Sequence, residues 1–263
     1  MDILTKIIAK KQERLEDAKQ SVSLDQIRNL AHEARRNAEQ HALLNALRSD
    51  NLNIIAEFKR RSPSKGIIRD NANLPEIVNS YTSAGAVALS VLTEEDHFSG
   101  SLDDLRQAKS LVDIPALRKD FIVDEYQVYE SAAAGADALL LIVAALDDET
   151  LSRLRRLTED ELGMDALVEV HTGDEMQRAA ASNAKLIGVN NRNLRTFEVT
   201  LETSLSLASQ TPREALLVSE SGLNTHADLQ RLRTAGYHGF LIGETLMRAE
   251  DPAQMLRDLR GRQ

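Results

Sequence analysis

The chain has no cysteine and no tryptophan among its 263 residues. Without cysteine there can be no disulfide bond, thiolate metal ligand or thiol nucleophile, and this composition fits a reducing compartment. Aromatic residues make up only 3% of the chain, so aliphatic side chains have to fill a large core. The six histidines are scattered singly, without the spacing that places two on one helical face, and we therefore predict no metal site.

An excess of positive charge is missing as well. The chain carries 41 acidic and 32 basic residues, a formal net charge of −9, and no long basic block. We therefore predict no nucleic-acid partner, and a site for an anion has to be a local cluster of cations. The first twenty residues lack the apolar run of a signal peptide, so we expect a cytoplasmic protein that does not bind membranes.

The pattern of hydrophobic residues changes near residue 50. Before it, Ile3, Leu4, Ile7 and Ile8 have the spacing of an amphipathic helix, and we expect residues 1–48 to form a helical extension that packs on the remainder. After it come eight short apolar runs, at 52–58, 87–93, 115–120, 137–145, 166–170, 186–190, 215–221 and 239–244. Segments of helical period separate these runs, and Ala-Gly pairs at 84–85, 134–135 and 235–236 precede three of them.

Such regular alternation of strand and helix indicates a parallel sheet covered by helices. Glycine directly after a helix supplies the left-handed residue that ends it, which explains the repeated Ala-Gly pairs. The GxGxxG turn typical of open dinucleotide-binding sheets is absent after the first run. Eight units over residues 49–263 therefore predict the α/β class and a closed (β/α)8 TIM barrel, with its interior filled mainly by Val, Ile, Leu and Ala.

Polar side chains stand in or directly after five of the apolar runs. They are Glu57, Lys59, Lys119, Asp120, Glu169, Asn190, Glu220 and Ser221. A single example would be explained by a surface charge or an internal ion pair. Five strands with the same feature predict an enzyme, because the carboxyl ends of barrel strands meet at one mouth, where active sites lie.

The last two strands end in glycine turns that lead into helices, at Gly222 and Gly243. Backbone amides at such turns bind phosphate, and the loops after strands 7 and 8 are the usual place for this site in barrels. A plain turn between strand and helix also favours glycine. Together, the two turns predict a small phosphorylated molecule as the substrate.

With these residues in view, the chain resembles the indole-3-glycerol phosphate synthase family. The matching segments are IIAEFKRRSPSKG, LSVLTEEDHFSGSLDDL, LRKDFIVDEYQVYES, ALVEVH, IGVNNRNL, VSESGL and FLIGETLMR, in family order over residues 50–250. The resemblance implies a lyase of tryptophan biosynthesis that needs no cofactor. This activity closes the indole ring of 1-(2-carboxyphenylamino)-1-deoxyribulose 5-phosphate with loss of carbon dioxide and water. We expect a monofunctional enzyme, as a monomer or weak homodimer.

The resemblance also implies roles for individual residues. Lys119 is the acid that protonates the substrate ketone, with its pKa tuned by nearby charge and burial. The proton transfers of the dehydration step fall to Glu169 or to the Lys59 and Glu57 pair, and this choice stays open. The catalytic set is Glu57, Lys59, Lys119, Glu169, Asn190 and Glu220; substrate contacts are Ser62, Phe98, Phe121, Arg192, Leu194 and Ser221; phosphate contacts are Ser62, Lys65, Gly222, Gly243 and Glu244.

One position departs from a familiar family choice. Glu244 stands in the second phosphate turn, where serine is common, and a carboxylate repels phosphate. We expect its amide to bind phosphate while its side chain turns away. Residues 60–66 are expected to form a lid with Gly66 as its flexible point. The alternatives are another phosphosugar-binding barrel enzyme and a non-catalytic binding subunit.

Overall fold

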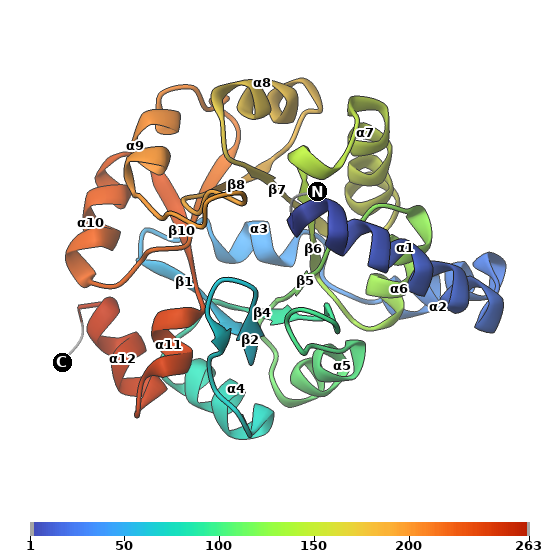
Figure 1. Cartoon of the computed structure of the whole chain (residues 1–263), viewed down its shortest axis with the longest axis horizontal. Coiled ribbons are helices and arrows are strands. Elements are labelled where there is room, and N and C mark those ends of the chain that lie inside the picture. The colour runs from blue at the N-terminus through green and yellow to red at the C-terminus, as the bar shows by residue number, and fades with distance from the viewer. Residues whose placement is uncertain (1–2, 262–263) are drawn as a thin grey trace.

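A computed structural model describes residues 3–261 and consists of a closed barrel of eight parallel strands (Figure 1). The strands are β1 (Asn53–Phe58), β4 (Ala88–Leu92), β5 (Ala116–Lys119), β6 (Ala138–Ile142), β7 (Asp165–Val170), β8 (Leu186–Asn190), β9 (Leu216–Glu220) and β10 (Tyr237–Ile242). Each strand pairs with its neighbour in the sequence, and β10 closes the barrel against β1. All eight apolar runs form strands, so the predicted (β/α)8 barrel is confirmed.

Helices surround the barrel (Figure 1). They are α4 (Leu74–Ser83), α5 (Leu102–Leu111), α6 (Glu125–Ala133), α7 (Asp148–Arg156), α8 (Gly173–Ala181), α9 (Glu202–Ala208), α10 (His226–Thr234), α11 (Glu244–Arg248) and α12 (Pro252–Leu259), with a short 3-10 helix η1 (Val143–Ala145) and a π-helix η2 (Leu157–Glu161). Side-chain caps begin many of them: Ser101 accepts from the amide of Asp104, and Thr225 from that of Asp228. In residues 3–261 no helix has the length and apolarity needed to cross a membrane.

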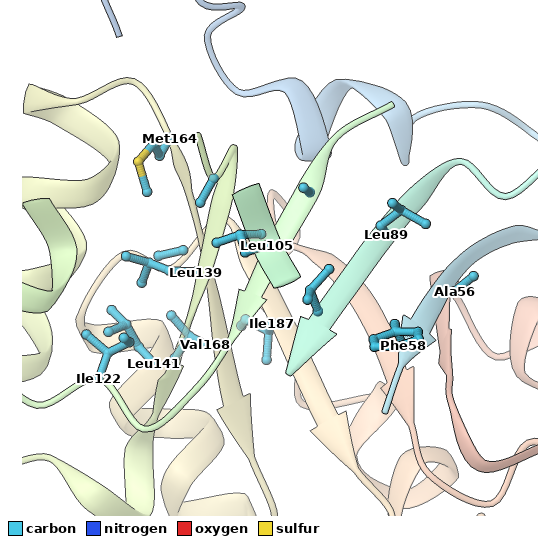
Figure 2. Packing of buried hydrophobic residues seen from close by; sticks show 14 of the residues in the cluster. Ala56, Phe58, Leu89, Leu105, Ile122, Leu139, Leu141, Met164, Val168 and Ile187 are labelled. Carbon is cyan, nitrogen blue, oxygen red and sulfur yellow. The ribbon is translucent and has the colours of Figure 1, made fainter. Parts of the chain in front are cut away.

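Strand alternation divides the core into two layers. Ile55 faces into the barrel together with aliphatic residues of the other strands, whereas Ile54 and Phe58 face outward to the helices. Figure 2 shows part of the outer layer, including Leu89 and Leu139. The same alternation sends Glu57 to the inside, two residues after Ile55, so the strand itself delivers this carboxylate to the barrel interior.

The N-terminal residues form α1 (Ile3–Ser21), α2 (Leu24–Arg35) and α3 (Ala42–Ala46). Helix α2 packs against α6, while α3 lies across the amino-terminal end of the barrel, where Leu43 and Leu47 are completely buried. Helix α1 passes over the opposite end, and its Ile7 is buried beside the mouth. Helix α3 thus covers the amino-terminal end of the barrel, and the open mouth lies at the carboxyl ends of the strands.

Two short strands follow β1. They are β2 (Arg61–Ser62) and β3 (Gly66–Ile67), which pair antiparallel. The loop expected to be a lid is therefore a small hairpin, and its turn carries Lys65 at the edge of the mouth. Ile67 is exposed at the end of this hairpin.

Candidate active site

A cavity of about 480 Å³ lies at the carboxyl ends of the strands. Its walls come from the strand ends, the β2–β3 hairpin, the loops after β8 and β9, and helix α1. All sixteen residues that the sequence singled out line it: Glu57, Lys59, Ser62, Lys65, Phe98, Lys119, Phe121, Glu169, Asn190, Arg192, Leu194, Glu220, Ser221, Gly222, Gly243 and Glu244. The barrel thus brings together in one cavity side chains that are far apart in the sequence.

Lys119 stands at the centre of the polar floor. Its Nζ atom lies 3.2 Å from Glu169 Oε2 and 3.3 Å from Glu220 Oε2. Both glutamate side chains are almost fully buried, so their charges are poorly screened by water. Gly188 on β8 leaves the room for Glu220, because a side-chain carbon there would overlap Glu220 Oε1.

Charge and burial set the protonation of this trio. Burial disfavours the ammonium of Lys119, yet Glu220 and Glu169 outweigh it and raise its pKa above the ordinary value. Burial likewise opposes the charge on Glu169, but Lys119 holds the pKa of that carboxyl well below its usual range. Burial raises the pKa of Glu220 to about 8 against the pull of Lys119. Near neutral pH, Lys119 is therefore an ammonium and Glu169 a carboxylate, and Glu220 takes up a proton more readily than an ordinary glutamate.

Glu57 and Lys59 form a second pair on the neighbouring side of the floor. Lys59 Nζ donates to Glu57 Oε1 at 2.5 Å, and Ser90 Oγ lies 3.5 Å from Glu57 Oε2. Gly243 makes space for this carboxylate, since a side-chain carbon at that position would overlap Glu57 Oε1. The ion pair with Lys59 offsets the free-energy cost of burying the Glu57 carboxylate inside the barrel.

A buried network holds the backbone next to Lys119. Asp120 is 1% exposed; Lys11 of helix α1 lies 2.9 Å from its Oδ1 and Arg118 lies 3.1 Å from its Oδ2. Thr93 Oγ1 also donates to Asp120 at 2.6 Å. Burial opposes the charge of Asp120, but Arg118 and Lys11 lower its pKa to about 2. Helix α1 is therefore tied directly to the residue that follows Lys119.

Aromatic and aliphatic side chains form one wall. The rings of Phe98 and Phe121 are 6.1 Å apart between centroids and tilted by 41°, an arrangement that aromatic pairs favour. Leu194 and Ile7 also line the cavity. The loop that carries Phe98 is shaped by the buried carboxylate of Glu94, which accepts from the backbone amides of residues 96–98. This wall offers an apolar surface to a flat ring.

Cations collect at the rim beside the two glycine turns. Lys65 and Arg248 lie 3.5 Å and 3.3 Å from Glu244 Oε1, and Arg192 lies 3.4 Å from Glu244 Oε2. We expected the Glu244 side chain to turn away, but it lines the cavity and pairs with three cations that an anionic ligand would need. The physical reason is attraction: a carboxylate surrounded by three positive charges stays among them.

The turn after β9 has an unusual backbone. Ser221 and Gly222 are consecutive residues with positive φ, 68° and 78°. Asn191 supports this turn: its Nδ2 donates to Ser221 O at 3.1 Å and to Ser219 Oγ at 3.0 Å. Strain of this kind is kept where the surrounding structure fixes the backbone, as it does at ligand sites.

Residues 4–259 match the family model described as indole-3-glycerol phosphate synthase. A curated protein of that name from Bacteroides thetaiotaomicron is 48% identical over 257 residues, which cover 98% of this chain and 97% of the relative. Another, from Carboxydothermus hydrogenoformans, is 43% identical over 261 residues, covering 97% and 98%. The chain belongs to the indole-3-glycerol phosphate synthase family.

A solved structure outside the indole-3-glycerol phosphate synthase family shares the fold. Thiamine phosphate pyrophosphorylase from Pyrococcus furiosus is 17% identical with a TM-score of 0.59, covering 83% of this chain and 96% of that chain. At such low identity, the likeness concerns the barrel architecture alone.

For this member of the indole-3-glycerol phosphate synthase family, several residues in or beside the cavity were given no role at the site from the sequence. Lys11 and Ile7 come from α1, and only an amphipathic pattern hinted at a buried face there. His171 lies two residues after Glu169, and Arg248 lies one turn after Glu244. Among residues 3–261, the carboxylates of Glu94, Glu95 and Asp96 are the one acidic cluster close enough together to hold a cation. The Glu94 carboxylate already accepts hydrogen bonds from backbone amides of its own loop.

Proposed function

We propose that the chain converts 1-(2-carboxyphenylamino)-1-deoxyribulose 5-phosphate to indole-3-glycerol phosphate, as a carboxy-lyase of tryptophan biosynthesis. The observation that carries the proposal is the position of Lys119, held by two buried glutamates at the centre of a cavity with an apolar wall and a cationic rim. The family membership of the chain supports the same reaction.

Lys119 is the proposed general acid for ring closure. When the aromatic carbon attacks the ketone, negative charge develops on the ketone oxygen, and a proton has to reach it. The surrounding carboxylates raise the pKa of Lys119 and keep it protonated, so a proton is available in every turnover. An alkoxide is a stronger base than a lysine amine, since water loses a proton only at pKa ~16 and an ordinary lysine at ~10. The raised pKa of Lys119 narrows this difference without reversing it. The transfer therefore runs downhill once the oxygen carries charge.

Glu169 and Lys59 are proposed to divide the dehydration step. Glu169 is ionised because Lys119 holds its pKa low. Once Lys119 has given its proton to the ketone oxygen, this attraction is lost, and the carboxylate becomes basic enough to accept a proton as the ring becomes aromatic. The Lys59 side chain is less buried than that of Glu169 and forms an ion pair with Glu57. This position suits donation of a proton to the departing hydroxyl. Asn190 and Glu220 border the same space and complete the proposed catalytic group.

Substrate binding is proposed to use the rest of the cavity. The phenyl ring packs against Phe98, Phe121 and Leu194, and Ser221 contacts the sugar portion. The phosphate lies near the amides of Gly222 and Gly243, within reach of Ser62, Lys65 and Arg192. These cations give the acidic protein a local positive field for a substrate that carries both a phosphate and a carboxylate. We further propose that the reaction needs no cofactor and that the chain acts as a monomer or weak homodimer.

The test mixes the purified protein with the substrate, without metal or cofactor, and follows the appearance of indole fluorescence. Lys119→Ala is expected to lower kcat by at least about a thousandfold, an effect of the size seen when a proton donor is lost. Lys185→Ala serves as the matched control, because Lys185 is exposed and absent from the cavity walls. An inactive parent that is folded and binds the substrate would refute the proposed function.

A further inference from the structure

His171 is held between two glutamates just outside the catalytic floor. Its Nε2 atom lies 3.3 Å from Glu169 Oε1, and its Nδ1 atom lies 3.2 Å from Glu175 Oε2. The ring is largely buried, as its side chain is 12% exposed. Glu169 comes from strand β7 and Glu175 from the first turn of helix α8.

Two carboxylates on opposite nitrogens decide the charge of the ring. A neutral imidazole has one N–H and one lone pair, and a lone pair directed at a carboxylate is repelled. The imidazolium has an N–H on both nitrogens and so presents positive charge to both carboxylates, although the 3.3 Å contact of Nε2 with Glu169 is a charge pair without hydrogen-bond geometry. Burial alone lowers the pKa of an imidazole, yet Glu169 and Glu175 outweigh it and raise that of His171 to about 10.

We propose that His171 is a positioning residue, which as an imidazolium holds the Glu169 carboxylate in place opposite Lys119. The two oxygens of Glu169 then have separate partners, Oε2 with Lys119 and Oε1 with His171. A carboxylate that faces a cation at each oxygen is restrained in its rotation, and it stays charged next to the reacting atoms. The inference rests on the proposed function only where it concerns the role of Glu169 as a base.

Glu175 holds the backbone and the ring of His171 in place. Its Oε2 accepts from the His171 backbone amide at 2.7 Å as well as facing the ring, and its own amide donates to Thr172 Oγ1. The start of α8 thereby fixes both the backbone and the charge of His171. The charged groups recorded around the ring are Glu169 on β7 and Glu175 on α8, and Lys119 on β5 faces the far oxygen of Glu169.

The first test needs no activity. Nitrogen NMR of the histidine-labelled full chain, assigned with His171→Asn, is expected to show both ring nitrogens of His171 protonated from pH 6 to 9. Glu175→Gln is expected to lower its titration midpoint by about one pH unit or more, because one of two facing charges is lost. A neutral His171 ring at pH 7 in the parent would overturn the inference, whatever the outcome of the activity assay.

The second test measures, through kcat and its pH dependence, whether His171 acts through Glu169. His171→Asn is expected to lower kcat by about tenfold, because Glu169 loses the positive charge that faces its Oε1, with KM changed less than twofold. The acid limb of kcat is expected at higher pH, because a carboxylate with one cation fewer takes up its proton more readily. In a Glu169→Gln background the same substitution should change kcat little.

His226→Asn is the matched control, since that ring contacts the backbone carbonyl of Leu259 and lies outside the cavity walls. It is expected to leave the pH profile unchanged. The positioning role would be refuted if His171→Asn lowered kcat equally in the parent and in the Glu169→Gln background. It would also be refuted if the acid limb of the kcat–pH profile did not move, since a purely structural histidine would give either result. An inactive parent would count against the proposed function, and the NMR result would still decide the charge of His171.

Discussion

Replacement of Glu244 by glutamine tests how the rim distinguishes a substrate phosphate from an internal carboxylate. Glu244 lies 3.3 to 3.5 Å from the side-chain nitrogens of Lys65, Arg192 and Arg248. With the carboxylate in place the four side chains sum to +2, and with glutamine they sum to +3. Glu244→Gln keeps the size of the side chain, so it removes the charge with little change of shape.

The magnitude follows from Coulomb's law. Two like charges about 4 Å apart repel by about 1 kcal/mol in water and about 4 kcal/mol at the effective dielectric of a protein surface. The Glu244 side chain is 27% exposed, and Arg248 is 51% exposed, so the lower figure applies. About 1 kcal/mol corresponds to roughly fivefold tighter phosphate binding in Glu244→Gln. Salt should reduce the difference, because the groups involved are partly exposed.

Calorimetry with inorganic phosphate measures this effect apart from catalysis. Glu250→Gln is the matched control: it changes the net charge of the chain equally, but Glu250 is exposed and absent from the cavity walls. We expect a lower dissociation constant for phosphate only in Glu244→Gln. An unchanged or higher constant would refute the reasoning, and it would mean that Glu244 organises the three cations for the ligand.

The barrel could be predicted because its signals are local. Each strand is a short apolar run, and each Ala-Gly pair ends a helix, as the positive φ of Gly85, Gly135 and Gly236 shows. The place of the site followed from the same pattern, since the carboxyl ends of all strands meet at one mouth. Strand periodicity also placed Glu57 inside the barrel, two residues after Ile55.

Contacts between distant segments could not be predicted in this way. Lys11 reads as one of several charges on an amphipathic helix, and only the fold reveals that it pairs with Asp120, 109 residues away. The Glu244 side chain was expected to turn away from the phosphate, because the sequence does not show how many cations gather there. His171 has an ordinary position after a strand, and its charge depends on Glu175 in the next helix.

Two further predictions concern residues that shape the floor. Gly243→Ala is expected to lower kcat by about tenfold or more, because its side-chain carbon would displace Glu57; a structure of the variant with Glu57 in place would contradict this. Asp120→Asn is expected to destabilise the fold most at neutral pH, as measured by urea unfolding at several pH values. The pKa of Asp120 falls from 3.8 to about 2 on folding, so its charge contributes about 2 kcal/mol above pH 4. That contribution is lost as the pH falls towards 2, where parent and variant should converge. At pH 7 the variant leaves Lys11 and Arg118 without their buried partner, and this loss of the same ion pairs is the physical origin of the difference. A difference in unfolding free energy that stays constant from pH 7 to pH 2.5 would show that the charge of Asp120 does not support the fold.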